Sequence, residues 1–195
     1  MQTRKVKLQD ITKISTGLPI QRYTDKEDMK KQKIIMNMPM LEINEEFPTE
    51  EEEIKADINP RFFSREHDIL YKVQQHSFAK EITTETNAII TNNYLIIRIN
   101  NQKEVNPTFL TYYLNDPRVE YQIQRTIDST KIMKVSTKIL KNLTILLPEK
   151  EVQDKQVELI NKINQRIELK KKSINCDEKL INSLYDTIIG DAYAN

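Results

Sequence analysis

Glycine and cysteine are almost absent from this sequence. Its 195 residues include only two glycines, Gly17 and Gly190, and a single cysteine, Cys176. Folds that bind nucleotides or adenosylmethionine need a glycine-rich turn where the backbone approaches the ligand closely, and neither glycine lies in one. One cysteine excludes an internal disulfide and a cysteine-based metal cluster, so Cys176 is expected to be an ordinary helix residue. The sequence therefore predicts no cofactor and no methyl transfer by this chain alone.

Long apolar runs are missing as well. No stretch approaches the roughly 20 apolar residues that a bilayer span needs, and Met1 is followed directly by Gln-Thr-Arg-Lys. Hydrophobic residues make up 38% of the chain, charged residues make up 30%, and the mean hydropathy is -0.63. This composition suffices for a folded core but leaves unusually polar faces. We expect a cytoplasmic protein that does not contact a membrane.

Residues that could form a catalytic site are present only as isolated fragments. His67 and His76 are nine residues apart, without a serine and carboxylate arrangement that would suggest a hydrolase. The Glu-Ile-Lys of residues 53–55, with Asp57 nearby, is similar to part of a nuclease metal site, because two carboxylates and a lysine can hold Mg²⁺ and orient water. No aspartate at the end of a strand precedes it, however. We therefore predict no catalytic residue and no metal ligand.

The net charge of +1 hides an uneven distribution of charged residues. Acidic residues concentrate at residues 45–53, and we expect this run to be exposed and to lack regular structure. Basic residues gather at residues 4–7, 30–33, 131–134 and 170–172. Such clusters permit a basic face on an almost neutral protein, although each is also compatible with ordinary solvated charge.

Short apolar segments and helix caps predict an α+β domain with a mixed sheet over residues 1–148. Leu8, Ile11 and Ile14 are expected to point inward from a short amphipathic turn near the start of the chain. Composition predicts one or two strands within residues 33–43, broken at Pro39, and further strands at 67–74, 87–91, 93–100, 131–136 and 143–148. Asn106 before Pro107 and Asp116 before Pro117 predict two short helices in tandem, and Ser136 is expected to cap a third helical turn.

After Pro148 the chain runs to Gly190 without another proline or glycine, which predicts one long helix over residues 149–190 and a tail at 191–195. About 40 residues at 1.5 Å each give a length on the order of 60 Å, more than a domain of this size can cover. Isoleucines recur every seven residues, as in a coiled coil, with polar Lys170 and Asp177 interrupting the seam. We expect a second copy to cover this seam, and an antiparallel pairing about Ile174 would place Lys170 near Asp177 or Glu178 of the other copy. The predicted dimer residues are Ile160, Ile163, Ile167, Ile174, Ile181, Leu184 and Ile188.

Four stretches of this chain resemble one half of a specificity (S) subunit of a type I restriction-modification system. They are VKLQDITKISTGLP at residues 6–19, HDILYKV at 67–73, VNPTFLTYYLNDPRVEYQI at 105–123 and VSTKILKNLTILLPEKEVQ at 135–153. Each stretch alone matches the family pattern only weakly, and the resemblance rests on the order and spacing of the four. It covers nearly the whole chain except about residues 24–60. Two positions depart from the family pattern, because His67 and Asp128 stand where a glycine is common.

The resemblance implies a target-recognition domain followed by a spacer helix. Full-length members carry two of each, whereas this chain carries one of each. A half-length version would act as a homodimer that reads two inverted DNA half-sites and positions methyltransferase (M) subunits, and possibly restriction (R) subunits, without catalysis of its own. The alternative is a scaffold or regulator that docks on the methyltransferase through its helix and reads no DNA.

Three polar or basic segments are the candidate DNA contacts, because phosphates bind Lys and Arg while base edges bind longer polar side chains. The strongest candidate is the segment around residues 129–134, followed by residues 74–77 and then residues 21–33. In each case a solvated loop is the competing interpretation. The predicted DNA-binding residues are Gln21, Arg22, Lys30, Lys31, Lys33, Gln74, Gln75, His76, Ser77, Ser129, Thr130, Lys131 and Lys134.

Overall fold

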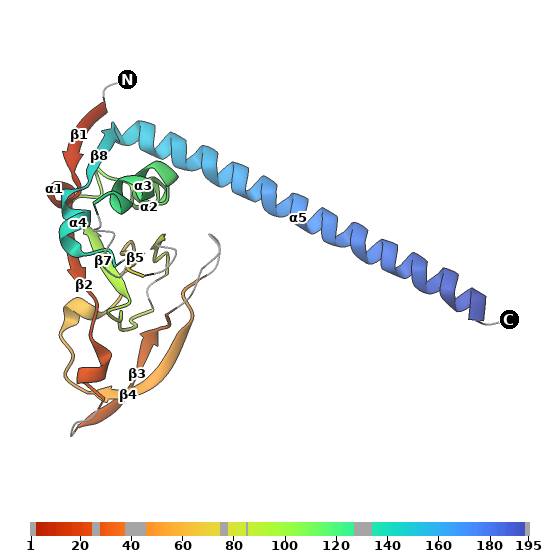
Figure 1. Cartoon of the computed structure of the whole chain (residues 1–195), viewed down its shortest axis with the longest axis horizontal. Helices are drawn as coiled ribbons and strands as arrows, with labels where there is room; N and C mark the ends of the chain where they lie inside the picture. The colour runs from red at the N-terminus through yellow and green to blue at the C-terminus, as the bar shows by residue number, and fades with distance from the viewer. Residues whose placement is uncertain are drawn as a thin grey trace. The chain divides into compact units, whose positions relative to one another are not determined.

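The computed structural model describes residues 3–24, 28–37, 46–74, 78–84, 86–126 and 134–193, with side chains described up to residue 189. The chain divides into two compact units, Met1–Gln153 and Asp154–Asn195. The first unit is an α+β domain and the second is the long C-terminal helix, so the predicted fold class is confirmed (Figure 1).

A four-stranded antiparallel sheet forms the centre of the domain. Its order is β2 (Thr12–Thr16), β7 (Tyr94–Ile99), β5 (Ile69–Lys72) and β6 (Ala79–Glu81). All four residues of β5 are buried, as expected for an inner strand covered on both faces. The segments 67–74 and 93–100 were predicted as strands and form β5 and β7, whereas β6 was not predicted.

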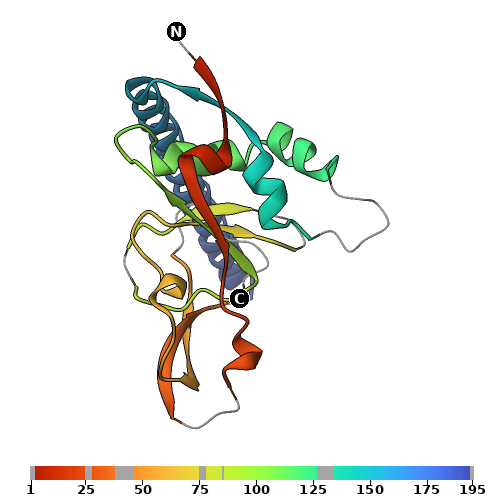
Figure 2. The ribbon, with the colours of Figure 1, turned by 90° about the vertical axis from the view of Figure 1, so that its left-hand side faces the viewer.

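Four short helices gather near one end of this sheet: α1 (Leu8–Ile11), α2 (Pro107–Leu114), α3 (Pro117–Gln124) and α4 (Thr137–Asn142) (Figure 2). The predicted caps are confirmed in each of the last three. The side chain of Asn106 accepts from the Phe109 N–H, that of Asp116 from the Arg118 N–H, and that of Ser136 from the Ile139 N–H. These local signals therefore fix where the helices begin.

The predicted burial at the start of the chain is confirmed, because Leu8, Ile11 and Ile14 are all at most 8% exposed. Gly17, which follows β2, is packed against the main chain. A Cβ atom at this position would lie 2.1 Å from the Thr91 carbonyl oxygen, far inside contact distance. This residue is glycine because of the close backbone approach, not because of an unusual φ angle.

Residues 87–91 do not form the predicted strand. The backbone groups of Ile89 and Ile90 form hydrogen bonds to several segments instead of to one neighbouring strand. The Ile89 N–H bonds to the Lys33 carbonyl and the Ile90 N–H to the Phe62 carbonyl, while the Leu18 N–H donates to the Ile90 carbonyl. Buried backbone groups need partners, and here they find them in three different parts of the chain.

The acidic run was expected to be irregular, and this prediction was wrong. Thr49–Lys55 forms β4, which pairs with β3 (Met29–Ile35) in a separate two-stranded sheet. Two short 3₁₀ helices, η1 (Ile20–Arg22) and η2 (Pro60–Phe62), flank this hairpin in the chain. The strand forms because Ile54 is fully buried in a cluster with Leu18 and Ile34, while the glutamates stay largely exposed.

A third sheet joins the two ends of the domain, where β1 (Thr3–Lys7) pairs antiparallel with β8 (Thr144–Pro148). The predicted strand at 143–148 is thus confirmed as β8, with Ile145 and Leu147 buried and Leu146 exposed. Strand β8 leads directly into α5 (Lys150–Tyr193).

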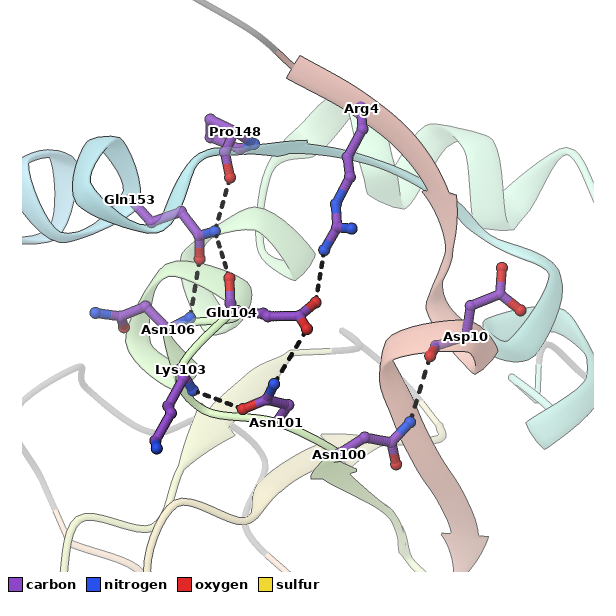
Figure 3. Close-up of polar contacts among 9 residues, drawn as sticks. All are labelled: Arg4, Asp10, Asn100, Asn101, Lys103, Glu104, Asn106, Pro148 and Gln153. Carbon is purple, nitrogen blue, oxygen red and sulfur yellow. Dashed lines mark hydrogen bonds and ion pairs between the residues drawn. The ribbon is translucent and has the colours of Figure 1, made fainter.

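The first turn of α5 is bonded to the domain through Gln153, which is 0% exposed (Figure 3). Its Oε1 accepts from the Asn106 N–H at 2.8 Å, and its Nε2 donates to the carbonyls of Glu104 at 2.9 Å and Pro148 at 2.8 Å. The Glu104 carboxylate also pairs with Arg4 at 2.8 Å, and this hydrogen bond lowers the Glu104 pKa. Gln153 therefore ties the start of α5 to the 104–106 segment, which lies nearly 50 residues earlier in the sequence.

The predicted long helix is confirmed as α5, and the apolar ladder predicted on it is solvent-exposed. Ile163, Ile167, Ile174, Ile181, Leu184 and Ile188 are 45–65% exposed, and Ile160 is half-buried. Cys176 lies on the same helix and is exposed. None of the helices in the described part of the chain combines the length and the apolar character that crossing a bilayer would require.

His67 occupies a left-handed backbone conformation, with φ of 67°. This is the turn in which the resembling family usually has glycine, and the structure keeps the turn with a histidine. The His67 Nδ1 lies 2.8 Å from the Glu81 carboxylate, which also accepts from the Thr108 hydroxyl at 2.7 Å. These bonds offset part of the cost of the conformation. Asp128, the other departure, lies outside the described residues.

Candidate nucleic-acid interface

Two of the predicted DNA-contact segments meet in the structure although they are about 60 residues apart in sequence. Gln74 and Lys134 form an isolated antiparallel bridge. Beside it, the Val135 N–H bonds to the Val73 carbonyl at 3.0 Å, and both valines are buried. The two valines hold the backbone in place, while the side chains of Gln74 and Lys134 are exposed. We call this pair the Gln74–Lys134 bridge.

The bridge lies at the end of β5, so the central sheet positions it. Val73 follows Lys72, the last residue of β5, and its N–H bonds to the Asn93 carbonyl at the start of β7. The cap residue Ser136 follows Val135 and begins α4. A strand end on one side and a helix start on the other hold the bridge on rigid elements, as precise recognition requires.

Six of the predicted DNA-binding residues lie outside the described part of the chain. They are Gln75, His76, Ser77, Ser129, Thr130 and Lys131.

Lys72 was not predicted and lies two residues before Gln74 of the bridge. It is 5% exposed, its Nζ lies 5.9 Å from the centre of the Phe78 ring, and burial lowers its pKa. Lys80 on β6 is 8% exposed, with its Nζ 5.8 Å from the Phe47 ring centre. Two cations buried in one sheet are unusual. The sequence did contain a signal for Lys72, because it is a lysine within an otherwise apolar predicted strand.

The other described candidates gather around the β3–β4 hairpin. Lys30, Lys31 and Lys33 line an open groove of about 410 Å³, together with Gln32, Ala56, Phe63, Thr86 and Asn87. Gln21 and Arg22 are exposed on η1, which adjoins the hairpin because the Lys55 N–H bonds to the Tyr23 carbonyl. The structure thus places η1 beside the hairpin that carries the three lysines.

Glutamates on β4 offset the charge of the lysines on β3. Lys31 stands opposite Glu53 in the strand register and Lys33 stands opposite Glu51. Side chains directly opposite in an antiparallel pair lie on the same face, about 5 Å apart at Cβ. The attraction of this face for phosphate is therefore weaker than its lysines alone suggest. The Gln74–Lys134 bridge has no such acidic strand beside it in the described residues.

The described residues include no metal-binding cluster, and the two fragments that could suggest an enzyme have other partners. No three His, Cys, Asp or Glu side chains among them come close enough together to hold a metal ion. Glu53 of the Glu-Ile-Lys segment faces Lys31 across the hairpin. His67 bonds to Glu81, and Thr108 donates to the same carboxylate and not to the imidazole, so the Thr108 hydroxyl is not aligned with His67 for attack.

No family model and no curated protein matches this sequence. Solved structures do match, and all three described here are type I restriction-modification proteins. The HsdS subunit from Thermoanaerobacter tengcongensis has a TM-score of 0.63 at 18% identity, over 88% of this chain and 39% of that one. A chain from a structural study of assembly and conformational transition in the type I R-M system gives the same TM-score and identity, over 88% of this chain and 40% of that one.

The S subunit from M. genitalium matches with a TM-score of 0.56 at 14% identity, over 86% of this chain and 40% of that one. This chain therefore has the fold of type I S subunits and spans about 40% of their length. At identities this low, the likeness establishes the shared fold and nothing further.

Proposed function

We propose that this chain is a half-length S subunit that reads DNA without catalysing a reaction. The observation that carries the proposal is the Gln74–Lys134 bridge. It joins the two segments with the strongest polar and basic signals on a fold shared with S subunits. Lys134 supplies charge for phosphate, and Gln74 supplies an amide that can donate to and accept from a base edge. The remaining predicted contacts, including Gln21 and Arg22, belong to the same proposal.

The exposed ladder on α5 supports a homodimer. From Ile163 to Ile188 the apolar ladder residues are 45–65% exposed, and water contact with so much apolar surface is unfavourable. A second copy carries the complementary surface, since each copy offers the same heptad seam. A twofold dimer would read two identical inverted half-sites, with the paired helices setting their separation. The methyltransferase, and a restriction subunit where one exists, would be positioned by this dimer in the cytoplasm.

A methylation-sensitive sequencing readout tests the function directly. A cell that expresses this chain with its methyltransferase should modify a split, inverted repeat, and deletion of the chain should abolish that modification. Purified chain with methyltransferase should bind the resulting duplex with an affinity that falls steeply with salt. Modification of an unrelated or undivided sequence would contradict the proposal.

Light scattering and cysteine crosslinking test the dimer and its orientation. The purified chain should have twice the monomer mass, and replacing Ile174 with lysine should yield monomer. Antiparallel pairing about Ile174 keeps the two Ile163 positions far apart. In a Cys176→Ser background, ready crosslinking of Ile163→Cys to itself would therefore refute this register.

The scaffold alternative is supported by one observation, the glutamates of β4 that face the β3 lysines. A protein that docks on a basic partner subunit would need an acidic exposed strand of this kind. Such a scaffold would show neither salt-dependent binding to duplex DNA nor preference for one sequence.

A further inference from the structure

A basic stretch free of acidic residues continues from the bridge into α4. Residues 129–148 contain four lysines and no aspartate or glutamate. Lys131 lies outside the described residues, whereas the structure describes Lys134, Lys138 and Lys141. All three are exposed, and only Lys134 belongs to the predicted DNA-binding set.

The geometry of α4 directs its polar residues to one side. Successive residues turn by about 100° around a helix, so Lys138, Lys141 and Asn142 share one face. That face is exposed, while Leu140 on the opposite face is 0% exposed. Helix α4, drawn in teal in Figure 2, is therefore anchored in the core with its lysines toward solvent.

Charge pairing distinguishes these lysines from Arg118 on the neighbouring part of the chain. Within the described residues, no ion pair involves Lys134, Lys138 or Lys141. By contrast, Arg118 on α3 is bound to Asp116 through its Nε and one terminal nitrogen, at 2.9 and 2.7 Å. The three lysines thus keep their charge available for an anionic partner.

We propose that Lys134, Lys138 and Lys141 form a phosphate-contact surface that positions the DNA duplex, separate from the groups that read bases. This inference rests on the proposed function and assigns phosphate contacts and base contacts to different residues. Lysines three residues apart on a helix have Cβ atoms about 5–6 Å apart. Their long stems can therefore reach neighbouring phosphates, which recur every 3.4 Å along one strand. Lysine binds phosphate as a point charge and carries no sequence information in that contact.

The test is a salt titration of duplex binding by the full chain with its methyltransferase, comparing the natural sequence with Lys138→Ala/Lys141→Ala. Each phosphate contact contributes about 0.9 to the slope of log K against log salt. The double variant should lower that slope by about 1.8. The ratio of affinities for target and scrambled duplex should stay within twofold. The Lys138→Arg/Lys141→Arg variant should restore the slope, because arginine also binds phosphate.

A matched control removes two other lysines, Lys172 and Lys179, which lie on α5 seven residues apart and face away from the ladder. This control has the same net charge as the α4 variant and should leave the slope unchanged. An equal fall in the control, an unchanged slope in the α4 variant, or a shift in sequence preference would each overturn the inference. Absence of salt-dependent binding by the natural chain would instead refute the proposed function. Thermal unfolding of both variants confirms that they fold, since exposed substitutions usually change stability by less than about 0.5 kcal/mol.

Discussion

Replacing Gln153 with leucine tests how the first turn of α5 is held to the domain. The side chain is fully buried and makes three hydrogen bonds of 2.8–2.9 Å, as an acceptor from Asn106 and a donor to Glu104 and Pro148. Leucine has a similar volume but can neither accept nor donate. The substitution therefore removes all three bonds while leaving little cavity.

The expected loss in the free energy of unfolding follows from the number of hydrogen bonds removed. A neutral hydrogen bond contributes about 1 kcal/mol, and a buried polar group left without a partner costs about 1–3 kcal/mol. We expect the free energy of unfolding to fall by about 3–5 kcal/mol. This is a large part of the roughly 5–15 kcal/mol that is typical of a whole domain.

Urea denaturation followed by circular dichroism measures the global effect, and hydrogen exchange at the Asn106 amide measures the local one. Exchange at this amide should accelerate strongly, because its acceptor is the Gln153 Oε1. Gln156→Leu, an exposed position on the same helix, is the matched control and should change stability by less than about 0.5 kcal/mol. A global loss below about 1 kcal/mol together with an unchanged Asn106 exchange rate would refute the reasoning.

Substitutions at three further positions test single features of the domain. Gly17→Ala should destabilise it by about 1–3 kcal/mol in urea denaturation, because the new Cβ would lie 2.1 Å from a backbone carbonyl oxygen; a neutral result would be inconsistent with this packing. His67→Val should unfold more readily than His67→Gly, because a β-branched residue tolerates a φ of 67° poorly; the reverse order would disprove strain at this turn. The Asp116 carboxyl should titrate by NMR near pH 2, because Arg118 lowers its pKa to about 2, and Arg118→Ala should raise that pKa toward about 3.9.

The sign of the Asp116 effect determines the pH range in which it acts. Its folded pKa is lower than its unfolded value, so the contact with Arg118 stabilises the fold at neutral pH. That contribution is lost as the pH falls through about 2. An Asp116 titration midpoint that does not change in Arg118→Ala would show that this pair has no such role.

Several elements could be predicted because their signals are local. Asn106, Asp116 and Ser136 cap the helices that their sequence context predicts, since a cap acts within three residues of itself. The strands at 67–74 and 93–100 were recognisable as apolar runs of ordinary strand length. The prediction for the acidic run was wrong because the burial of one isoleucine, Ile54, stabilises a strand beside β3 although most of its residues are glutamates.

The candidate site was predictable only as separate segments. Polar composition selected the segments around Gln74 and Lys134, but nothing local indicated that they would pair. The pairing depends on Val73 and Val135 being buried together at the end of β5. The same holds for residues 87–91, whose composition is that of a strand but whose hydrogen bonds go to three segments.

The amino-acid sequence by itself determined the helix starts, the long C-terminal helix and the exposed isoleucine ladder, because periodicity and capping act between residues a few positions apart. Only the tertiary structure decided that Gln74 meets Lys134, that the acidic run becomes β4, and that Gln153 binds the backbone of Glu104 and Asn106. Those contacts link residues tens of positions apart. Their selection depends on how the whole core packs and on which buried polar groups still need partners.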